Sequence, residues 1–533
     1  MNNAELIVAT LKKAGVNHGF GIPSGNVLPV MEAMRTGGIE FVLTAHEGSA
    51  GFAADVTGRL TGIPGFCIAT LGPGATNLAT GVGNAWLDRS PMIAMTCNLN
   101  TDQLGRRIQM YIDHHALFAP ITKATLPLRE GNVAETLAEA IKIATTEPYG
   151  PVHLDLPEDV ALAAAQEEIP EFSLPQAPKA APQADLDEAV AALSESKRPV
   201  AILGSTAMRI EDHGQILAFI EKHQIPFATT TMAKGLIDDD HPLAIGCIER
   251  ACRQHQRTFL RSADLIVGVG YDTIEVEFEA WIGDTPLLQI DIDKADLADS
   301  VTLRYEVTGD LSQSLEVLAD TASISNDWAA SELIGHRKTF NELLRPIGSG
   351  FTAYQAIDAV RAALPSDGIL SFDVGAHTHQ IASQWNSPAA KRFLITNGWS
   401  SMGFGLPSAI AAKLACPDQP VVCLIGDGCF QMTCGELATA KRQGITLPVV
   451  VLDDRWLGLI RVKQMRRQYG IYGTELQPEE YRDPPEHYFG VPAMGVRNPE
   501  ELRAAVENAL NADGPIVIEA VVDSEHYIET VFD

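Results

Sequence analysis

GDGCFQMTCGELATAKRQGITLPVVVLDD (residues 426–454) begins with an aspartate between two glycines and ends with two more aspartates. The apolar run VVCLIG (421–426) leads into it and LPVVVL (447–452) closes it, which predicts a strand, a turn, a helix and a second strand. Such a succession is typical of a parallel sheet covered by helices on both faces. Neighbouring parallel strands end at the same edge of a sheet, so we expect Asp427 and Asp454 to lie close together.

The residue types at this predicted edge suit a divalent cation and a phosphate. Mg²⁺ prefers one or two carboxylates together with waters and phosphate oxygens. Gly426 and Gly428 would let the backbone approach a phosphate closely, and the following helix would offer N–H groups to it. The alternative is ordinary turn chemistry, because aspartate and glycine end many strands. The GDG triplet on its own favours that alternative.

The same alternation of apolar strands and helical patterns runs through the whole chain of 533 residues, which is too long for one core. Two linker-like stretches divide it, a Pro- and Ala-rich one at 166–185 and a polar helical one at 325–350. We therefore predict an α/β fold of three doubly wound parallel-sheet domains at 1–165, 186–325 and 350–533. The predicted strands are 41–46, 65–70, 91–98, 152–157, 199–205, 226–231, 265–270, 287–293, 368–373, 421–427, 447–454 and 515–522.

Composition excludes several classes of protein. The formal net charge of -29 would repel nucleic acid and anionic membranes. No apolar run reaches the roughly 18 residues of a membrane span. The N-terminal stretch 1–16 reads as an amphipathic helix rather than a cleavable signal. The 8 cysteines form no CxxC pair, which argues against a disulfide framework or a zinc site. We expect a cytoplasmic enzyme with no nucleic-acid or membrane partner.

Residues 426–464 resemble the cofactor-binding motif of thiamine diphosphate-dependent 2-oxo acid decarboxylases and carboligases, and in particular of acetolactate synthase-like enzymes. The resemblance implies that Mg²⁺ is bound by Asp427, Asp454 and the main-chain carbonyl of Trp456. It also places Gly426, Gly428 and Cys429 at the cofactor. An Asp–Asp pair stands here where Asn–Asn is commoner in the family, and its oxygens still suit a hard cation.

A second motif surrounds Glu47. TAHEGSAGFAADVTGRLTG (44–62) places this residue between an apolar strand and an Ala- and Gly-rich helix. A first-turn glutamate that favours the helix dipole is an equally good interpretation of these residues alone. The segment resembles the catalytic-glutamate segment of the family, so Glu47 is expected to hydrogen-bond the pyrimidine ring of the cofactor and to promote its activation. An apolar slot would raise the pKa of Glu47, as that proton transfer requires.

Further segments resemble the pyrimidine-binding and diphosphate-binding domains of the family. The Gly-Pro-Gly turn centred on Pro73 is expected to contact the cofactor, with a loose loop as the alternative. His377 aligns with a family histidine at the diphosphate, although a loop histidine is more often merely solvated. Met402 is implied as the bulky residue under the bent cofactor, although a methionine there is otherwise ordinary core. The segments are 21–34, 70–95, 373–385 and 397–415.

The central segment LIVGVGYDTIEVEFEAWIG (265–283) resembles that of FAD-free, catabolic acetolactate synthases. No GxGxxG follows the strand at 199–205, so we expect FAD to be absent, and a flavin or NAD oxidoreductase has no support. A non-catalytic relative would have lost Glu47 or Asp427, and both are present. In the family the glutamate domain of one chain faces the metal domain of another. The resemblance therefore implies a homodimer or homotetramer with active sites between subunits.

Three segments are candidates for the substrate pocket. By resemblance, 106–123 contributes Gln109 near the reacting carbon. His114 and His115 follow it, and adjacent helical residues diverge by roughly 100°, so only one is expected to point inward. The C-terminal His526 and Tyr527 form a weaker candidate that would close over the site.

The third segment, 454–470, aligns Ile460 and Lys463 with the acceptor pocket. Three arginines surround Lys463, and this cationic cluster is either a solvated helix face or an attractor for an anionic group on the substrate.

These observations predict a thiamine diphosphate- and Mg²⁺-dependent lyase or carboligase acting on a 2-oxo acid. The resemblance favours pyruvate as the donor and a second carbonyl compound as the acceptor. A simple decarboxylase of the benzoylformate or branched-chain type, which releases an aldehyde, is the close alternative. A 2-hydroxyacyl-CoA lyase is more remote, because no further basic segment suggests a nucleotide clamp.

Overall fold

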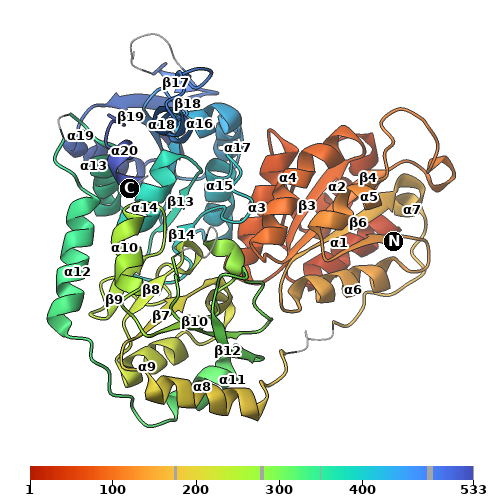
Figure 1. The fold of residues 1–533 in the computed structure, drawn as a ribbon. Helices are drawn as coiled ribbons and strands as arrows, with labels where there is room; N and C mark the ends of the chain where they lie inside the picture. The colour runs from red at the N-terminus through yellow and green to blue at the C-terminus, as the bar shows by residue number, and fades with distance from the viewer. Residues whose placement is uncertain (173–176, 277–280, 349, 477–483, 532–533) are drawn as a thin grey trace.

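The computed structural model describes residues 1–172, 177–276, 281–348, 350–476 and 484–531. Three sheets with helices on both faces succeed one another along the chain, which confirms the predicted fold class (Figure 1). We call the units built on them the first, central and third domains; their limits stay a prediction. Positions 173–176 of the first predicted linker and 277–280 of the quoted central segment lie outside the described residues.

The first sheet has the order β2-β1-β3-β4-β6-β5, and all its neighbours are parallel. α1, α2 and α6 cover one face, and α3 and α4 cover the other. Its strands are β1 (His18–Gly21), β2 (Glu40–Leu43), β3 (Gly65–Thr70), β4 (Met92–Asn98), β5 (Ala124–Pro127) and β6 (Pro151–Pro157). Its helices are α1 (Asn3–Lys13), α2 (Leu28–Gly37), α3 (Glu47–Thr61), α4 (Pro73–Leu87), α5 (His114–Phe118), α6 (Val133–Thr145) and α7 (Glu158–Leu162).

The central sheet is also parallel, in the order β12-β11-β10-β7-β8-β9, so the order in which strands are added reverses between β7 and β10. α8, α9 and α11 pack on one face, and α10 and α12 on the other. Its strands are β7 (Pro199–Leu203), β8 (Phe227–Thr229), β9 (Ala244–Cys247), β10 (Leu265–Val269), β11 (Leu287–Asp291) and β12 (Leu303–Thr308). Its helices are α8 (Gln183–Glu195), α9 (Gly214–His223), α10 (Arg253–Leu260), α11 (Leu311–Ala319) and α12 (Ala330–Leu343).

The third sheet has the order β14-β13-β15-β16-β19-β18-β17, in which the β17–β18 pair is antiparallel. The helix predicted between the two aspartate-bearing strands is two helices, α16 and α17. Its strands are β13 (Ile369–Phe372), β14 (Phe393–Leu394), β15 (Val421–Gly426), β16 (Leu447–Asp453), β17 (His487–Tyr488), β18 (Val491–Val496) and β19 (Pro515–Val521). Its helices are α13 (Ala353–Ala363), α14 (Ala376–Gln384), α15 (Gly405–Ala415), α16 (Asp427–Thr433), α17 (Glu436–Arg442), α18 (Gly458–Arg466), α19 (Pro499–Ala509) and α20 (Tyr527–Thr530).

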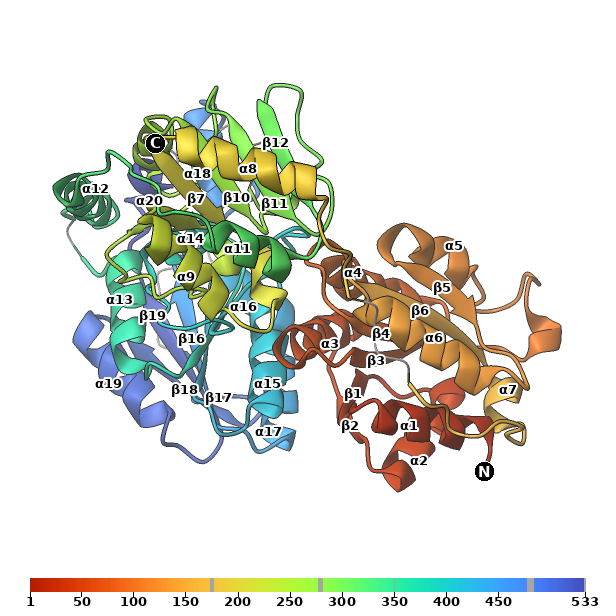
Figure 2. The ribbon, with the colours of Figure 1, turned by 90° about the horizontal axis from the view of Figure 1, so that it is seen from below.

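One hydrophobic core joins the first and third domains. α3 and α4 from the first sheet and α15 from the third lie between the two sheets (Figures 1 and 2). α3 and α4 approach each other at two glycines: a Cβ atom on Gly81 would lie 2.5 Å from the Cα atom of Gly51. Because these two positions have no side chain, α4 lies close against α3, the helix that begins with Glu47.

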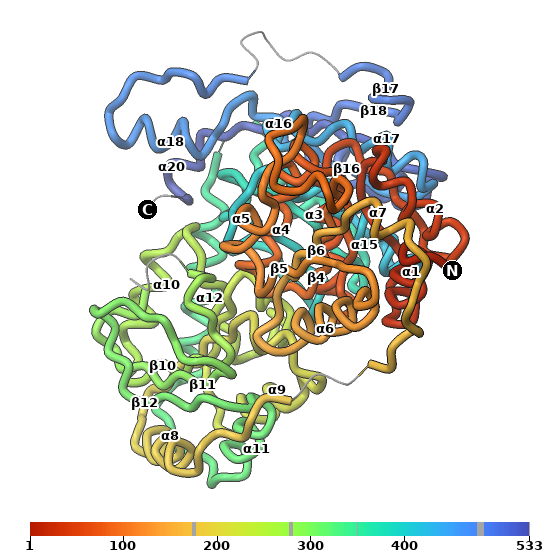
Figure 3. The backbone as a smooth tube through the Cα atoms, turned by 90° about the vertical axis from the view of Figure 1, so that its right-hand side faces the viewer, coloured from red at the N-terminus to blue at the C-terminus, as the bar shows by residue number. Residues whose placement is uncertain are grey.

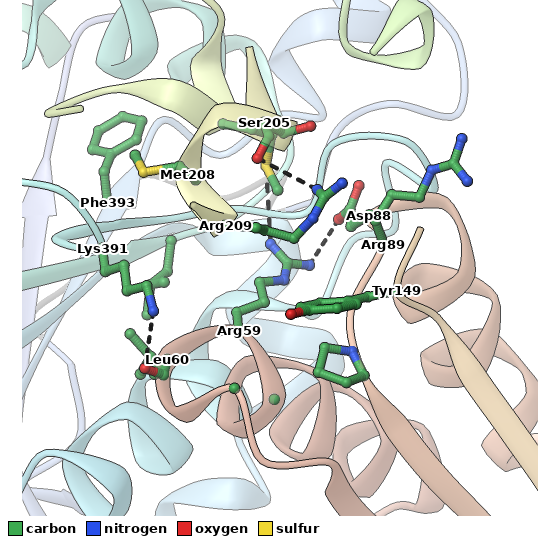
Figure 4. Close-up of a pocket in the computed structure, with 15 residues that line it drawn as sticks. Arg59, Leu60, Asp88, Arg89, Tyr149, Ser205, Met208, Arg209, Lys391 and Phe393 are labelled. Carbon is green, nitrogen blue, oxygen red and sulfur yellow. Dashed lines mark hydrogen bonds and ion pairs between the residues drawn. The ribbon is translucent and has the colours of Figure 1, made fainter. Parts of the chain in front are cut away.

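Buried charges near the end of α3 connect the first domain to the third. Arg59 forms ion pairs with Asp55 and Asp88, and its Nη2 atom lies 2.8 Å from an Asp88 oxygen. It also donates to the carbonyl of Ile395 in the third domain at 2.6 Å. Asp88 in turn accepts the N–H of Gly398 at 2.7 Å. A cavity of about 150 Å³ lies beside this network, between elements of the three domains (Figure 4). Arginines that line it already have carboxylate partners, so we read the cavity as part of the domain junction.

Among the described residues, no helix combines the length and apolar composition that crossing a membrane would require.

The α3–α4 crossing yields a stability prediction. Gly81→Ala should lower the free energy of unfolding by about 1–3 kcal/mol, because the added methyl group meets backbone that cannot rotate away. Urea denaturation followed by circular dichroism measures this. Gly335→Ala is the matched control, since a Cβ on this exposed α12 glycine meets no atom within 4 Å. It should be neutral or stabilising. Equal effects of the two substitutions would contradict the proposed crossing.

Candidate active site

A pocket of about 230 Å³ lies at the carboxyl edge of the third sheet. β15 and β16 are adjacent and parallel, so the residues that follow them reach the same edge. Asp427 and Asp454 both line the pocket, and Tyr527 of α20 lies on its wall. The lining residues are 374–377, 400, 402, 426–429, 452, 454, 456–460 and 527.

Three aspartates crowd this edge. The N–H of Arg455 donates to Asp427 at 2.9 Å and to Asp453 at 3.1 Å, which holds these two carboxylates beside each other. Asp454 accepts the N–H of Trp456 at 2.9 Å. Burial, and then the charges of Asp454 and Asp453, raise the pKa of Asp427 to about 9, while burial raises that of Asp454 to about 6. Such a cluster suits a divalent cation, whose charge would offset this repulsion.

The rest of the pocket wall fits a phosphate-bearing ligand. His377 of α14 is buried, and its Nε2 atom has no hydrogen-bond partner among the described residues. Burial lowers the pKa of His377 to about 4, so the ring is neutral at pH 7. A Cβ on Gly426 would lie 2.8 Å from this ring, and one on Gly428 would lie 3.0 Å from Leu457. The two glycines therefore leave room that no other residue would leave.

Of the cofactor and acceptor residues predicted in the third domain, only Lys463 lies outside the described lining of the pocket. Met402 and Cys429 line the pocket, and the Cys429 thiol donates to the carbonyl of Val374 at 3.1 Å. Ile460 also lines it and is 44% exposed. Lys463 lies one turn further along α18, outside the lining, and burial and the charges of Arg250 and Arg467 lower its pKa. α18 and α20 run side by side at this end of the molecule (Figure 3).

Glu47 stands at the start of α3, in the first domain. Its side chain is 8% exposed, and its Oε2 atom accepts a hydrogen bond from Asn77 of α4 at 3.0 Å. Gly74 lies directly against its Oε1 atom, since a Cβ there would be 3.3 Å away. None of the described residues that line the Asp427 pocket belongs to the first domain. A single chain therefore does not bring Glu47 into that pocket.

Glu436, which the sequence analysis missed, supports the segment that carries Glu47. It is buried at the start of α17 and accepts the N–H groups of Ala45 at 2.9 Å and His46 at 3.2 Å. From sequence alone, a glutamate in the first turn of a helix is explained by its favourable interaction with the helix dipole. Only the packing of the third domain against the first reveals these contacts.

The remaining predicted residues lie in the loop before α5, at the start of α5 and at the start of α4. Gln109 is exposed, and Pro73 is exposed as the first residue of α4. His115 is half-buried and hydrogen-bonds Thr125 at 2.6 Å. His114 is buried inside the first domain, where Asp155 lies 3.0 Å from its Nδ1 atom. The buried member of the pair thus faces protein rather than an open pocket.

The corresponding edge of the central sheet is partly occupied by the chain itself, beside a cavity of about 60 Å³. Doubly wound sheets bind ligands where the strand order reverses, here between β7 and β10. The Glu275 carboxylate occupies this place, accepting the N–H groups of Ser205 at 2.8 Å and Asp272 at 3.0 Å. It also accepts the hydroxyl of Thr230 at 2.5 Å, and burial raises its pKa to about 8.

Family models match most of the chain. The N-terminal domain that binds thiamine pyrophosphate in thiamine pyrophosphate enzymes matches residues 1–117. The central domain of these enzymes matches residues 186–318. Their C-terminal domain, which also binds thiamine pyrophosphate, matches residues 373–520 and so contains every lining residue of the Asp427 pocket except Tyr527.

Curated relatives match over nearly the full length. The acetolactate synthase large subunit of Lactococcus lactis is 30% identical over 547 residues, which cover 99% of this chain and 94% of that protein. Isozyme 2 of the acetolactate synthase large subunit of Escherichia coli is 28% identical over 532 residues, 98% of this chain and 96% of that protein. The probable acetolactate synthase large subunit of Methanococcus aeolicus is 28% identical over 566 residues, 100% and 94% respectively.

Glu275 in the central crevice makes a pH-dependent prediction. Its folded-state pKa is about 8, above the unfolded value of 4.5, so its contribution to stability is complete below pH 4.5 and is lost progressively as pH rises from there to 8. Glu275→Gln keeps the hydrogen-bonding shape without the ionisation. The variant should gain on the order of a few kcal/mol relative to the parent protein between pH 5 and pH 8.5. Parallel urea titrations across this range test it, and identical pH profiles would contradict it.

Proposed function

The chain belongs to the thiamine diphosphate-dependent, acetolactate synthase-like enzymes, and we propose that it uses this cofactor with Mg²⁺ to decarboxylate pyruvate and join the remaining two-carbon unit to a second carbonyl compound. The observation that carries the proposal is the pair of carboxylates, buried Asp427 and half-buried Asp454, in one pocket beside the ring nitrogen of His377, which has no partner among the described residues. That donor set fits a metal-bound diphosphate. The names of the relatives support the acetolactate synthase-like outcome.

Within this proposal, specific residues of the third domain hold the cofactor. Thiamine diphosphate, when bound, supplies a nucleophilic carbon and an electron sink for decarboxylation. Asp427, Asp454 and the carbonyl of Trp456 would hold Mg²⁺. The diphosphate would lie against Gly426, Gly428, Cys429 and His377, with Met402 supporting the bend of the cofactor.

The first domain supplies the proton chemistry. Glu47 would hold a proton at the pyrimidine ring, with its carboxylate oriented by Asn77. The Pro73 turn would form part of the wall beside that ring, and Gln109 would face the reacting carbon. His115 stays a polar candidate near this loop. Ile460 and Lys463 would border the acceptor, and Tyr527 would close the pocket.

We propose that Glu47 reaches the pocket from a second copy of the chain, so that the smallest active unit is a homodimer. The support is the absence of first-domain residues from the described lining of the Asp427 pocket. Exposed large apolar side chains also flank both halves of the site: Met110 and Ile112 near Pro73, and Met432 and Ile460 near Asp427. Such side chains are favoured where a partner covers them.

Two further features bear on the cofactor and the compartment. The Glu275 carboxylate lies in the crevice of the central sheet and the cavity beside it is about 60 Å³, which favours an enzyme without FAD or another dinucleotide there. All eight cysteines are free thiols, as a reducing cytoplasm would keep them.

The first experiment supplies pyruvate, thiamine diphosphate and Mg²⁺ to the purified protein and measures CO₂ together with acetolactate and acetaldehyde. We expect CO₂ and acetolactate, both lost on chelation of the metal. Acetaldehyde without acetolactate would instead indicate a simple decarboxylase. No CO₂ from pyruvate or from a panel of other 2-oxo acids would overturn the proposal.

Mixing two inactive variants tests the intersubunit site. Glu47→Gln and Asp427→Asn should each lower kcat by at least about 10²-fold, because one removes the proton carrier and the other a metal ligand. After unfolding and refolding together, about a quarter of the wild-type activity should return, since hybrid dimers regain one intact site. Each variant refolded alone is the control. No recovery, despite hybrid dimers shown by native mass spectrometry, would place both residues in one chain's site.

Lys463 yields a prediction on substrate choice. Its half-buried ammonium has no acidic partner among the described residues and lies near other cations, which favours an anionic group on the acceptor. Lys463→Gln should lower kcat/KM for a 2-oxo dicarboxylic acid by about tenfold while leaving pyruvate unchanged. Lys338→Gln, on exposed α12, is the control. Unchanged kcat/KM ratios between monoanionic and dianionic acceptors would show that the cluster is a solvated helix face.

A further inference from the structure

A buried polar cluster lies beneath the start of α4, and the proposed chemistry does not use it. His114 begins α5, His153 and Asp155 lie on β6, and Thr96 lies on β4. All four are buried. The Thr96 hydroxyl is 2.9 Å from Nδ1 of His114, 2.8 Å from Nε2 of His153 and 3.2 Å from Asp155.

The hydrogen bonds of His114 fix its tautomer. The backbone N–H of Gly72 can only donate, and it points to Nε2 of His114 at 3.3 Å. The neutral ring therefore carries its proton on Nδ1, which faces Asp155 at 3.0 Å. Asp155 also accepts two hydrogen bonds from Asn98, at 3.0 and 3.1 Å. Although burial opposes ionisation, these partners lower the pKa of Asp155 and keep it an anion.

The cluster does not require a metal. Ligand atoms of His114, His153 and Asp155 lie within 4.8 Å of one another, a spacing that a metal ion could accept. The Thr96 hydroxyl, however, already lies between the two imidazoles and Asp155. The other nitrogen of His153 is bonded to Thr125 at 2.8 Å. The four side chains thus satisfy one another as a hydrogen-bond network.

Gly72 connects this network to Glu47. It adopts φ +62°, and a Cβ atom there would lie 2.3 Å from the carbonyl oxygen of Met110, so the position requires glycine. It caps α4 without a side chain of its own. Two residues on, Gly74 lies against one oxygen of Glu47, and Asn77 hydrogen-bonds the other at 3.0 Å. A shift of this first turn therefore moves the surroundings of both carboxylate oxygens.

We propose that Asp155 and His114 are positioning residues for Glu47: the anion orients the imidazole, the imidazole holds the N–H of Gly72, and the first turn of α4 holds the glutamate. The inference rests on the proposed function, in which Glu47 carries the proton to and from the cofactor. It gives His114 a role as a hydrogen-bond acceptor from backbone, in place of proton exchange with the substrate.

Two substitutions distinguish the roles of the two ring nitrogens of His114. In His114→Asn the amide group can still donate to Asp155 but does not reach the Gly72 N–H. In His114→Gln the longer side chain can place its oxygen near the position of Nε2 and accept from Gly72. We expect His114→Asn to lower kcat by about tenfold, because the loss of one hydrogen bond accounts for an effect of this size. KM and cofactor affinity should stay unchanged. His114→Gln should stay within about threefold of the parent protein.

Two readouts report on the positioning itself. Hydrogen–deuterium exchange mass spectrometry of the cofactor-free protein should show faster exchange for a peptide spanning 70–77 in His114→Asn than in His114→Gln. With cofactor bound at saturation, deuterium exchange at its reactive carbon should slow in His114→Asn in proportion to kcat. A purely structural histidine would change the melting temperature of the protein without slowing this exchange.

His223→Asn is the matched control. His223 is equally buried and has both ring nitrogens bonded to backbone groups, but it lies in the central domain. The control should lower the melting temperature and leave exchange at the cofactor carbon unchanged. If His114→Asn behaves like this control, the inference is wrong. If His114→Asn does not fold, His114→Gln still decides, because a folded but inactive His114→Gln would show that the imidazole itself exchanges protons.

These outcomes are separate from failure of the proposed function. A wild-type protein that releases no CO₂ from any 2-oxo acid would remove the proposed function. A wild-type protein that is active, with His114→Asn equally active, would remove only the positioning role. Exchange at 70–77 needs no cofactor and tests the Gly72 contact in either case.

Discussion

Burial of like charges at one sheet edge is the constraint on which the third domain depends. Asp427, Asp453 and Asp454 are carried to the same place by β15 and β16, and the pKa values of all three are raised, with burial as the main cause. A fold that served only its own stability would place apolar or neutral side chains there. The arrangement becomes favourable once a divalent cation and its bound anion enter the pocket. We therefore read the edge as built for a ligand.

A second constraint separates this edge from Glu47 within one chain. The shared core around α3, α4 and α15 packs the helix of Glu47 against the third domain, where Glu436 accepts the N–H groups of the two residues just before this helix. Arg59 and Asp88 fix the other end of α3 to the same domain. The internal packing that makes the chain compact thus keeps Glu47 away from the Asp427 pocket. A second subunit is the simplest means of joining them.

Apolar runs predicted the sheets well, because a strand buried on both faces must be apolar throughout. β3, β4, β15 and β16 are of this kind, and the meeting of Asp427 and Asp454 after β15 and β16 followed from topology. β1 has four residues, two of them glycine, and β12 is largely polar, so neither has a readable pattern. Contacts such as Glu436 with Ala45 or His114 with Gly72 join residues far apart in sequence. No local pattern encodes them, since each side chain also has an ordinary local role.

The three domains also show that a shared topology leaves function open. Each sheet is doubly wound, and each has a carboxyl edge where a ligand can bind. In the central domain the chain's own Glu275 accepts N–H groups at that edge. In the first domain a closed network of histidine, threonine and aspartate lies beneath the turn next to Glu47. In the third domain three acids meet at the edge with raised pKa values, which favours a bound cation there. The side chains at the strand ends, and not the winding of the sheet, therefore determine how the three domains differ in function.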